Sequence, residues 1–303
     1  MSQATGDDGK ELSCASRLVL GTAAFQHGYG ITNGGKSPEQ KQCWSLLEAG
    51  LAQGIKKIDT AAAYGEAERL LGDFGMKNFS VITKVHCEES RAGEDLEEKL
   101  VQSLRRLQIP RCYGLLLHNE EALAGASGVK IAGALHGLIR KGLVEKIGVS
   151  SYEAAQAELL VEKYGLQILQ IPCHPLDRRV VESGTLRRWT EGGIEVHLRS
   201  IFLQGLLLQE LPVSARATPS LPLAETRRFR EKCKAAGISP LQACLSFVWE
   251  ASPTASVVIG PTSVDELTQI IDYRPDRSLV EPDWLLAWSP SFDPRTWGKP
   301  LGQ

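Results

Sequence analysis

The sequence has no marked excess of either charge, no long apolar run and no disulfide pattern. Lys and Arg number 34 against 36 Asp and Glu, so the net charge is −2 and nothing indicates a nucleic-acid partner. No apolar run approaches the roughly 18 residues of a membrane span. Residues 1–12 lack the basic and then apolar order of a signal peptide. We therefore expect neither nucleic acid nor a membrane as a partner.

Cysteine usage argues against both disulfides and metal. The chain has seven cysteines, an odd number, at wide spacing and with no C-x-x-C. Such thiols are typical of small buried hydrophobic side chains in a reducing cytoplasm, where we expect this protein. The adjacent pairs His86-Cys87 and Cys173-His174 lack the spacing of a zinc site, so we predict no metal.

A glycine-rich dinucleotide fingerprint is also missing. The first predicted strand leads into residues 21–26, Gly-Thr-Ala-Ala-Phe-Gln, rather than G-x-G-x-x-G. That fingerprint usually follows the first strand of an open, doubly wound sheet. Its absence disfavours such a sheet.

Short β-branched runs instead alternate with longer segments of helical period. Strands are expected at Arg17–Thr22, Ile55–Asp59, Phe79–Lys84, Tyr113–His118, Glu145–Ser150, Ile168–Ile171, Glu195–Ser200 and Ala255–Gly260. Helices are expected at Pro38–Gln53, Glu66–Phe74, Glu94–Leu107, Val129–Lys141, Glu153–Tyr164, Val180–Glu191, Leu223–Ala236, Pro240–Glu250 and Ser263–Ile271. Eight β/α units predict an α/β fold, the (β/α)₈ TIM barrel.

No linker divides the chain, so we expect one domain over residues 1–303. Its core would cover about residues 17–275, with a C-terminal extension at 276–303. That extension holds Trp284, Trp288 and Trp297, which predict that it packs back onto the body.

The ends of three successive predicted strands carry reactive side chains. They are Asp59, which Tyr64 follows five residues later, then Lys84 and His118. In a barrel of this kind, reactive groups lie at the carboxyl ends of strands. A phenol with a pKa near 10 is a weak acid, but a neighbouring ammonium lowers that pKa, and a carboxylate holds the ammonium in place. With a neutral imidazole to orient a carbonyl oxygen, the set suits proton donation to a carbonyl that is being reduced.

These segments resemble the aldo-keto reductase family. Residues 58–68 match the signature D-T-A-x-x-Y-G-x-x-E, Ile82–Lys84 and Leu115–His118 match the lysine and histidine strands, and residues 147–151 resemble G-V-S-N. The resemblance implies an oxidoreductase with Tyr64 as general acid, tuned by Asp59 and Lys84, and with His118 orienting a small carbonyl substrate. It also implies NADP(H) as cofactor, with NAD(H) usable. Tyr29-Gly30-Ile31, in the loop Gln26–Lys36, resembles a bacterial branch often associated with surface carbohydrates.

The resemblance also implies a cofactor site at the carboxyl ends of the strands. Its expected members are Gly21, Thr22, Ser150, Ser151, Gln170, Arg199, Ser200, Leu203, Gly205, Gly260, Thr262, Ser263, Glu266 and Gln269. Ser150 and Gln170 match positions that hold the nicotinamide carboxamide, and Ser151 replaces the usual Asn. Arg199 stands where many relatives place a stacking Tyr, and Glu266 where NADP-dependent relatives carry an Arg. We therefore expect weak selectivity for NADPH.

Two functions of different class follow from this pattern. One is an active NAD(P)H-dependent carbonyl reductase. The other is a non-catalytic, cofactor-binding regulatory or assembly protein on the same fold. The complete set of Asp59, Tyr64, Lys84 and His118 favours the enzyme. The patterns indicate no oligomeric state and no individual carbonyl compound.

Overall fold

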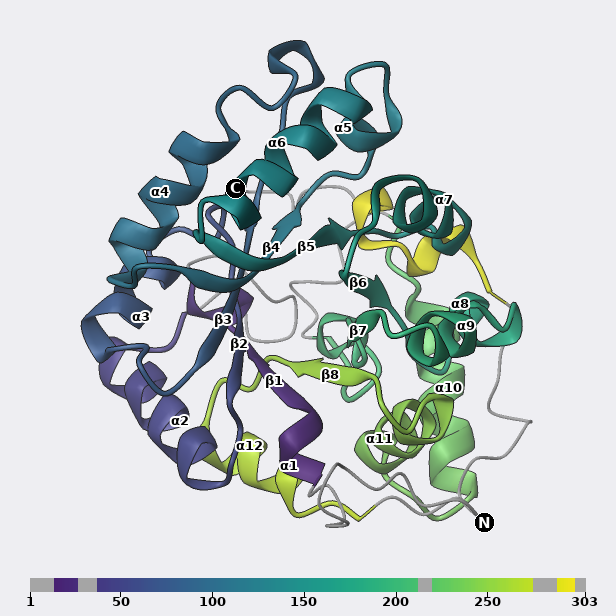
Figure 1. Cartoon of the computed structure of the whole chain (residues 1–303). Coiled ribbons are helices and arrows are strands. Elements are labelled where there is room, and N and C mark those ends of the chain that lie inside the picture. The colour runs from purple at the N-terminus through teal and green to yellow at the C-terminus, as the bar shows by residue number, and fades with distance from the viewer. Residues whose placement is uncertain (1–13, 27–36, 212–219, 275–287, 298–303) are drawn as a thin grey trace.

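The strands form a closed parallel barrel in which each strand pairs with its neighbours in sequence (Figure 1). The structure is a computed structural model that describes residues 14–26, 37–211, 220–274 and 288–297. The strands are β1 Leu18–Gly21, β2 Lys57–Asp59, β3 Ser80–Val85, β4 Cys112–Leu117, β5 Val144–Ser150, β6 Ile168–Pro172, β7 Glu195–Arg199 and β8 Ser256–Ile259. The predicted (β/α)₈ barrel is confirmed, and each expected strand overlaps an observed one.

Helices surround the barrel. They are α1 Cys14–Arg17, α2 Gln40–Ala52, α3 Ala67–Phe74, α4 Leu96–Leu107, α5 Glu121–Ala124, α6 Gly128–Arg140, α7 Ala154–Tyr164, α8 Arg179–Glu182, α9 Thr185–Glu191, α10 Leu223–Ala235, α11 Pro240–Ala251 and α12 Val264–Ile271. The single helix expected at Val180–Glu191 was wrong. Gly184 adopts a left-handed φ of 70° and divides that segment into α8 and α9.

Side chains alternate along each strand between the helices and the barrel interior. The outward set forms the main core with the helices and includes Leu20, Ile58 and Leu115. Inside the barrel, Ile82, Leu116 and Ile168 form a small separate cluster. Two residues beyond Ile82 and Ile168 on their strands, Lys84 and Gln170 lie at the carboxyl end. The apolar layer therefore underlies the layer that carries the candidate site.

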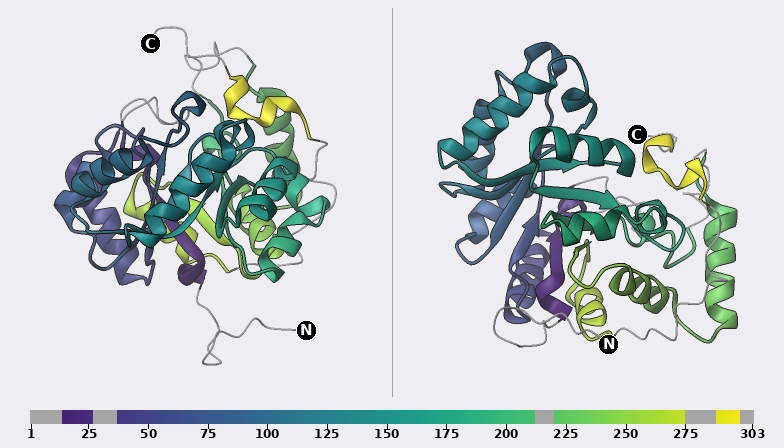
Figure 2. Two further views of the ribbon diagram at one scale, coloured as in Figure 1. Left: turned by 45° about the horizontal axis from the view of Figure 1, so that its top comes forward. Right: turned by 45° about the vertical axis from the view of Figure 1, so that its right-hand side comes forward.

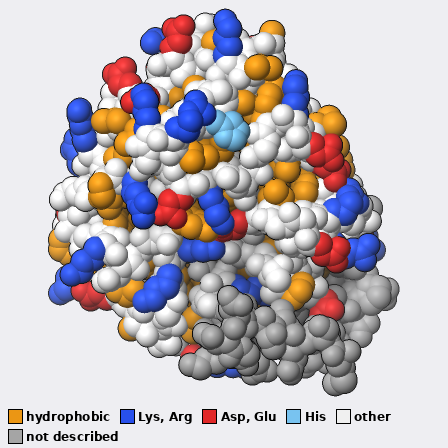
Figure 3. All heavy atoms as spheres, viewed as in Figure 1, with side chains coloured by type: hydrophobic (Ala, Val, Ile, Leu, Met, Phe, Trp, Pro, Cys, Tyr) orange, Lys and Arg blue, Asp and Glu red, His pale blue; other side chains and the backbone are white. Residues whose placement is uncertain are grey.

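A charged cluster fills the opposite end of the barrel. Glu195 accepts hydrogen bonds from Lys57 and Lys146, each at 2.6 Å, and its Oε1 lies 2.8 Å from Nε2 of His197. The hydroxyl of Tyr113 donates to the same carboxylate. These partners lower the pKa of Glu195 in spite of its burial. Figure 3, viewed from this end, shows acidic and basic side chains gathered at the centre of the face.

A C-terminal segment packs on the carboxyl end of the barrel. Figure 2 shows residues 290–296 on the side of the barrel opposite α1. Phe292 is 2% exposed and joins a satellite core with Leu203 and Phe229, against which Trp297 also packs. Residues 288–297 thus meet the expectation that the extension contacts the body. Trp284 and the Tyr29-Gly30-Ile31 segment lie outside the described residues.

The six cysteines that the structure describes in full, from Cys43 to Cys244, are all buried free thiols. Burial raises the pKa of the Cys43 thiol to about 11, so this thiol is not reactive. Within the described parts of the chain, no helix combines the length and apolar character needed to cross a membrane.

Candidate active site

Parallel pairing brings the ends of β2, β3 and β4 to one rim. Asp59 on β2 stands in register with Ile82 on β3, and Lys84 on β3 with Leu116 on β4. The ladder continues past β4, because the His118 N–H donates to the Val85 carbonyl at 2.9 Å. The strands therefore bring together the Asp, Lys and His that the sequence placed at their ends.

Lys84 is the centre of this group. Its Nζ donates to Asp59 Oδ2 at 2.6 Å, to the Thr60 carbonyl at 2.9 Å and to the Tyr64 hydroxyl at 3.4 Å. Asp59 Oδ1 accepts from Gln170 Nε2 at 2.6 Å. The Lys84 side chain is 1% exposed, so it does not line the cavity itself but supports the residues that do. A buried ammonium requires such a paired, fully bonded setting.

Tyr64 is a protonated phenol at neutral pH. Burial raises its pKa, the charge of Asp59 raises it further, and the charge of Arg199 lowers it in part. The pKa of Tyr64 is thus raised, although the neighbouring Lys84 ammonium was expected to lower it. Burial is the largest cause of the raised pKa, because it disfavours the charged phenolate. The Tyr64 hydroxyl therefore keeps its proton at neutral pH.

His118 lies beside Tyr64, with ring centroids 5.9 Å apart in an edge-to-face arrangement. His86 contacts its other side at 5.0 Å. Burial, together with the charges of Lys84, His86 and Arg199, lowers the pKa of His118 to about 3. Its Nδ1 is buried and has no hydrogen-bond partner within the described part of the chain. His118 also lines the cavity described below, where a neutral imidazole can form a hydrogen bond with a carbonyl oxygen.

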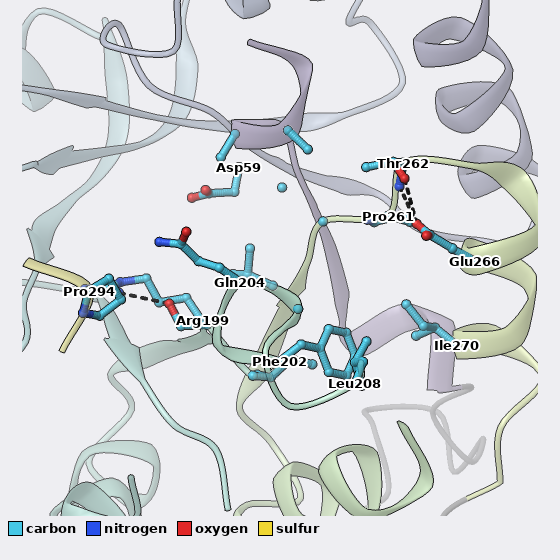
Figure 4. Close-up of a pocket in the computed structure, with 18 of the residues that line it drawn as sticks. Asp59, Arg199, Phe202, Gln204, Leu208, Pro261, Thr262, Glu266, Ile270 and Pro294 are labelled. Atoms are coloured by element: carbon cyan, nitrogen blue, oxygen red, sulfur yellow. Dashed lines mark hydrogen bonds between the residues drawn. The ribbon is translucent and has the colours of Figure 1, made fainter. Parts of the chain in front are cut away.

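A cavity of about 640 Å³ extends from this group toward α12. Asp59, Tyr64 and His118 line one end. Figure 4 shows Arg199 and Pro294 on one side of it and Thr262 and Glu266 on the other. Ten of the expected cofactor residues line the cavity: Gly21, Ser150, Gln170, Arg199, Ser200, Gly205, Gly260, Thr262, Glu266 and Gln269.

The other four expected cofactor residues do not line it. The Thr22 hydroxyl donates to the Asp59 carbonyl at 3.1 Å, Leu203 is fully buried in the satellite core, and Ser263 caps α12 by accepting from the Glu266 N–H. The Ser151 hydroxyl donates to the buried Glu120 and accepts from the Glu153 N–H at 3.0 Å. None of these four side chains contacts the cavity. Ser263 is exposed, and the other three are buried behind the cavity wall.

Sequence reasoning missed several lining residues. Tyr152, Phe202, Gln204, Leu208 and Pro294 all line the cavity. Phe202 and Gln204 lie in the segment after β7 that holds the expected Ser200, Leu203 and Gly205, and Tyr152 directly follows the β5 motif. Closeness in sequence to expected site residues could therefore have identified these three. Pro294 comes from the C-terminal segment, and no sequence pattern indicates which barrel loop that segment meets.

The segment after β7 has an unusual backbone. Ser200, Leu203 and Gln204 have left-handed φ values of 57°, 48° and 52°. Such a conformation costs a non-glycine residue of the order of 1–3 kcal/mol, and strain of this kind concentrates at functional sites. The turn places Ser200, Gln204 and Gly205 together on the cavity wall.

The far end of the cavity is acidic. Glu266 Oε2 accepts from the Thr262 N–H at 2.7 Å and from its hydroxyl at 3.0 Å. The carboxylate thus occupies the N-terminus of α12, where the helix dipole favours negative charge. That position is one that an anionic phosphate could otherwise use.

Glu68, the last residue of the motif at residues 58–68, has a structural role. It is 1% exposed, accepts from the Thr83 hydroxyl at 2.6 Å and from Arg106 Nε at 2.7 Å, and so ties α3 to β3 and α4. It does not line the cavity.

Two features of the cavity lining suit a nicotinamide dinucleotide. A Cβ at Gly260 would project into open space, since its nearest neighbour would be the Gly21 carbonyl oxygen at 3.9 Å. Close approach of a ligand to the backbone is a usual reason for glycine at such positions. Ser150 Oγ and Gln170 Oε1 lie 3.5 Å apart on the wall near Asp59 and offer polar groups to a carboxamide. Among the described residues, no three His, Cys, Asp or Glu side chains gather as a metal site would require.

Comparison with known proteins agrees with this geometry. An aldo-keto reductase of Bacillus subtilis (strain 168) is 28% identical over 187 residues, which span 56% of this chain and about half, 53%, of that protein. A D-threo-aldose 1-dehydrogenase of a Pseudomonas species is 24% identical over 301 residues, 84% of this chain and 91% of that protein.

Among solved structures, the holo form of an aldo-keto reductase from Bacillus halodurans superposes with a TM-score of 0.71 at 18% identity, covering 91% of this chain and 95% of that one. The glycerol dehydrogenase of Gluconobacter oxydans gives 0.68 at 20% identity over 88% and 90%. These two structures establish the fold. The sequence model of the aldo/keto reductase family matches residues 17–284. Because that match spans most of the sequence, the chain belongs to the aldo/keto reductase family.

Proposed function

We propose that this oxidoreductase reduces the carbonyl of an aldehyde, ketone or sugar to an alcohol with NAD(P)H, and that Tyr64 is the general acid. The observation that carries the proposal is the contact of the Tyr64 hydroxyl with Lys84 Nζ at 3.4 Å, at the end of a cavity that His118 also lines. A phenol, a buried ammonium–carboxylate pair and a neutral imidazole at one point make a proton donor beside an oxygen-binding site.

The residues divide the reaction as follows. His118, neutral because its pKa is lowered to about 3, donates a hydrogen bond to the carbonyl oxygen and orients it toward Tyr64. Tyr64 gives its proton to that oxygen as negative charge develops there. Lys84 Nζ, held by Asp59 at 2.6 Å, stabilises the phenolate that remains. A reduced nicotinamide, when bound, supplies the hydride to the carbonyl carbon and is oxidised in the process.

The cavity wall would hold that cofactor along its length. Ser150 and Gln170 would bind the carboxamide near Asp59, and the open space beside Gly260 would admit the chain of the dinucleotide close to the backbone. Gln170 donates to Asp59 through Nε2 at 2.6 Å, which leaves its Oε1, 3.5 Å from Ser150 Oγ, as the acceptor for the carboxamide N–H. The dehydrogenase names among the relatives are consistent with the reverse reaction at the same site.

Tyr64→Phe tests the proposal. The variant keeps the ring and its contact with His118 but loses the proton, so turnover should fall about 10²–10⁴-fold while the affinity for NADPH, measured by fluorescence titration, changes little. Tyr113→Phe, which removes a hydroxyl at the other end of the barrel, is the matched control and should retain activity. A Tyr64→Phe variant with more than about a tenth of the wild-type rate would contradict the assignment. Cofactor binding without turnover on a broad carbonyl panel would instead favour a regulatory protein.

A further inference from the structure

Arg199 is a rigid cation in the wall of the cavity. It ends β7, is half-buried, and lines the same cavity as Tyr64 and His118. Its Nη1 donates to Ser200 Oγ at 3.3 Å and its Nη2 to the Ser151 carbonyl at 3.1 Å. The guanidinium also stacks on the Tyr152 ring, with Cζ 4.0 Å from the centroid. Each terminal nitrogen keeps a second N–H, so a forked donor remains for a ligand.

A second arginine covers the other side of the same ring. Arg295, from the C-terminal segment, also has its Cζ 4.0 Å from the Tyr152 centroid. Arg295 is paired with Asp293 at 2.7 Å and lies 3.8 Å from Glu121 and 4.0 Å from Glu153. By contrast, no carboxylate in the described parts of the chain forms an ion pair with Arg199. Two cations therefore flank one tyrosine, and only one of them is compensated.

The charged groups nearest Arg199 have other partners. Glu120 accepts from the Ser151 hydroxyl and the Tyr152 N–H and forms no ion pair with Arg199. Asp59 is committed to Lys84 at 2.6 Å. Tyr64 and His118 are both neutral at pH 7, since burial raises the pKa of the first and lowers that of the second to about 3. Glu266 lies at the far end of the cavity, across from Arg199 (Figure 4).

We propose that Arg199 is a specificity residue that binds a carboxylate on the carbonyl substrate, so that the protein prefers oxo acids over neutral aldehydes and ketones. A guanidinium held flat by a ring and two acceptors presents the planar fork that matches a carboxylate. The proposal rests on the reductase function proposed above, and the reaction is unchanged. Hydride from the reduced nicotinamide goes to the carbonyl carbon, the Tyr64 proton goes to the oxygen, and the carboxylate takes no part in bond making.

Matched acid and ester pairs test this preference directly. Glyoxylate, pyruvate and succinic semialdehyde place the carboxylate at different distances from the carbonyl, and each has a neutral methyl ester with the same carbonyl. For at least one pair, we expect kcat/KM for the acid to exceed that for the ester by about ten- to a hundredfold, the range expected for a charge-assisted, two-point hydrogen bond. A neutral ester that is always the better substrate would overturn the proposal. Turnover of no carbonyl compound at all would instead refute the proposed reductase function.

Variants of Arg199 test whether this residue causes the preference for the acid over the ester. Arg199→Gln should bring the acid-to-ester ratio close to one, whatever happens to the absolute rates, and Arg199→Lys should retain part of the ratio because it keeps the charge without the fork. Arg295→Gln is the matched control, because it removes the compensated cation from the other side of Tyr152 and should leave the ratio largely intact. A ratio that collapses in Arg295→Gln but not in Arg199→Gln would contradict the assignment.

A binding measurement separates substrate from cofactor and does not depend on turnover. Calorimetric titration of the cofactor-loaded protein with oxamate should give at least tenfold tighter binding than titration with neutral oxamide, and Arg199→Gln should abolish that difference. If Arg199→Gln weakens cofactor affinity at least tenfold and leaves the oxamate-to-oxamide difference intact, Arg199 serves the cofactor and the proposal fails. Thermal unfolding of each variant confirms that it is folded.

Discussion

Replacing Glu266 should change the choice between NADPH and NADH. The carboxylate lies at the N-terminus of α12, bonded to the N–H and hydroxyl of Thr262 and facing the far end of the cavity. We expect the adenosine end of the cofactor to reach this point, because the opposite end holds the acid–base group. NADPH carries a 2′-phosphate there, and NADH a neutral hydroxyl. The wild-type protein should therefore use NADH and show weak selectivity for NADPH.

The repulsion between the Glu266 carboxylate and the 2′-phosphate determines how large the change in cofactor preference should be. Two unit charges about 4 Å apart repel by about 1 kcal/mol in water and by about 4 kcal/mol at an effective dielectric near 20. Glu266 is exposed, so the lower part of that range applies, and salt screens it further. Glu266→Gln should thus improve kcat/KM for NADPH about five- to tenfold, since 1.4 kcal/mol is a tenfold change, with little effect on NADH. Glu266→Arg should gain more, because it adds a phosphate partner.

The assay compares kcat/KM and the fluorescence-derived Kd of both cofactors at low and high salt. Asp265→Asn is the matched control: it removes an exposed charge from the same helical turn but lies outside the cavity lining. The gain for NADPH should shrink at high salt. A wild-type preference for NADPH above about 100-fold, or no gain in either Glu266 variant, would show that another residue governs the choice.

Two further predictions concern buried groups. Lys84→Met should reduce turnover about as much as Tyr64→Phe, and the losses should not multiply in the double variant, because both residues belong to one proton-donating unit. Combining Asp59→Asn with Lys84→Met avoids leaving an unpaired buried carboxylate. Multiplicative losses in the double variant of Lys84 and Tyr64 would indicate that Lys84 has a separate role. Burial lowers the pKa of fully buried His174 from 6.5 to about 4, so its contribution to stability is complete above pH 6.5 and is lost as the pH falls toward 4. His174→Gln should reduce the slope of unfolding free energy against pH by up to about 1.4 kcal/mol per unit in that window, measured by urea titration, and an unchanged slope would contradict this.

The barrel and the meeting of three strand ends that carry reactive side chains were predictable because their signals are local. Asp59, Lys84 and His118 each end a short buried strand, and parallel pairing then brings successive ends to one rim. The two-residue alternation along a strand could also have indicated which side chain near the end of β5 does not line the cavity. Lys146 and Ser150 face the barrel interior, so the next residue, Ser151, must face away.

Other features depend on contacts between segments that are distant in sequence. Pro294 and Arg295 reach the cavity rim through the fold of the C-terminal segment, which no periodicity reports. Within one short motif, Asp59 and Tyr64 face the cavity while Glu68 anchors α3 to α4 through Arg106. Residue type and spacing do not distinguish these roles, because all three side chains are polar and close in sequence, and only their packing separates them.

The pKa of Tyr64 shows the same dependence on packing and has a consequence for the site. The sequence identifies the Lys84 ammonium as the group that should favour the Tyr64 phenolate. The size of its effect on the Tyr64 pKa depends on which other groups the ammonium is paired with. Lys84 is paired with Asp59 at 2.6 Å, and the pKa of Tyr64 is raised first by burial and then by the Asp59 charge. Arg199 is then the cation whose unbalanced charge lowers it. Under the proposed function, Arg199 would therefore help to stabilise the phenolate from outside the set of Asp59, Tyr64, Lys84 and His118.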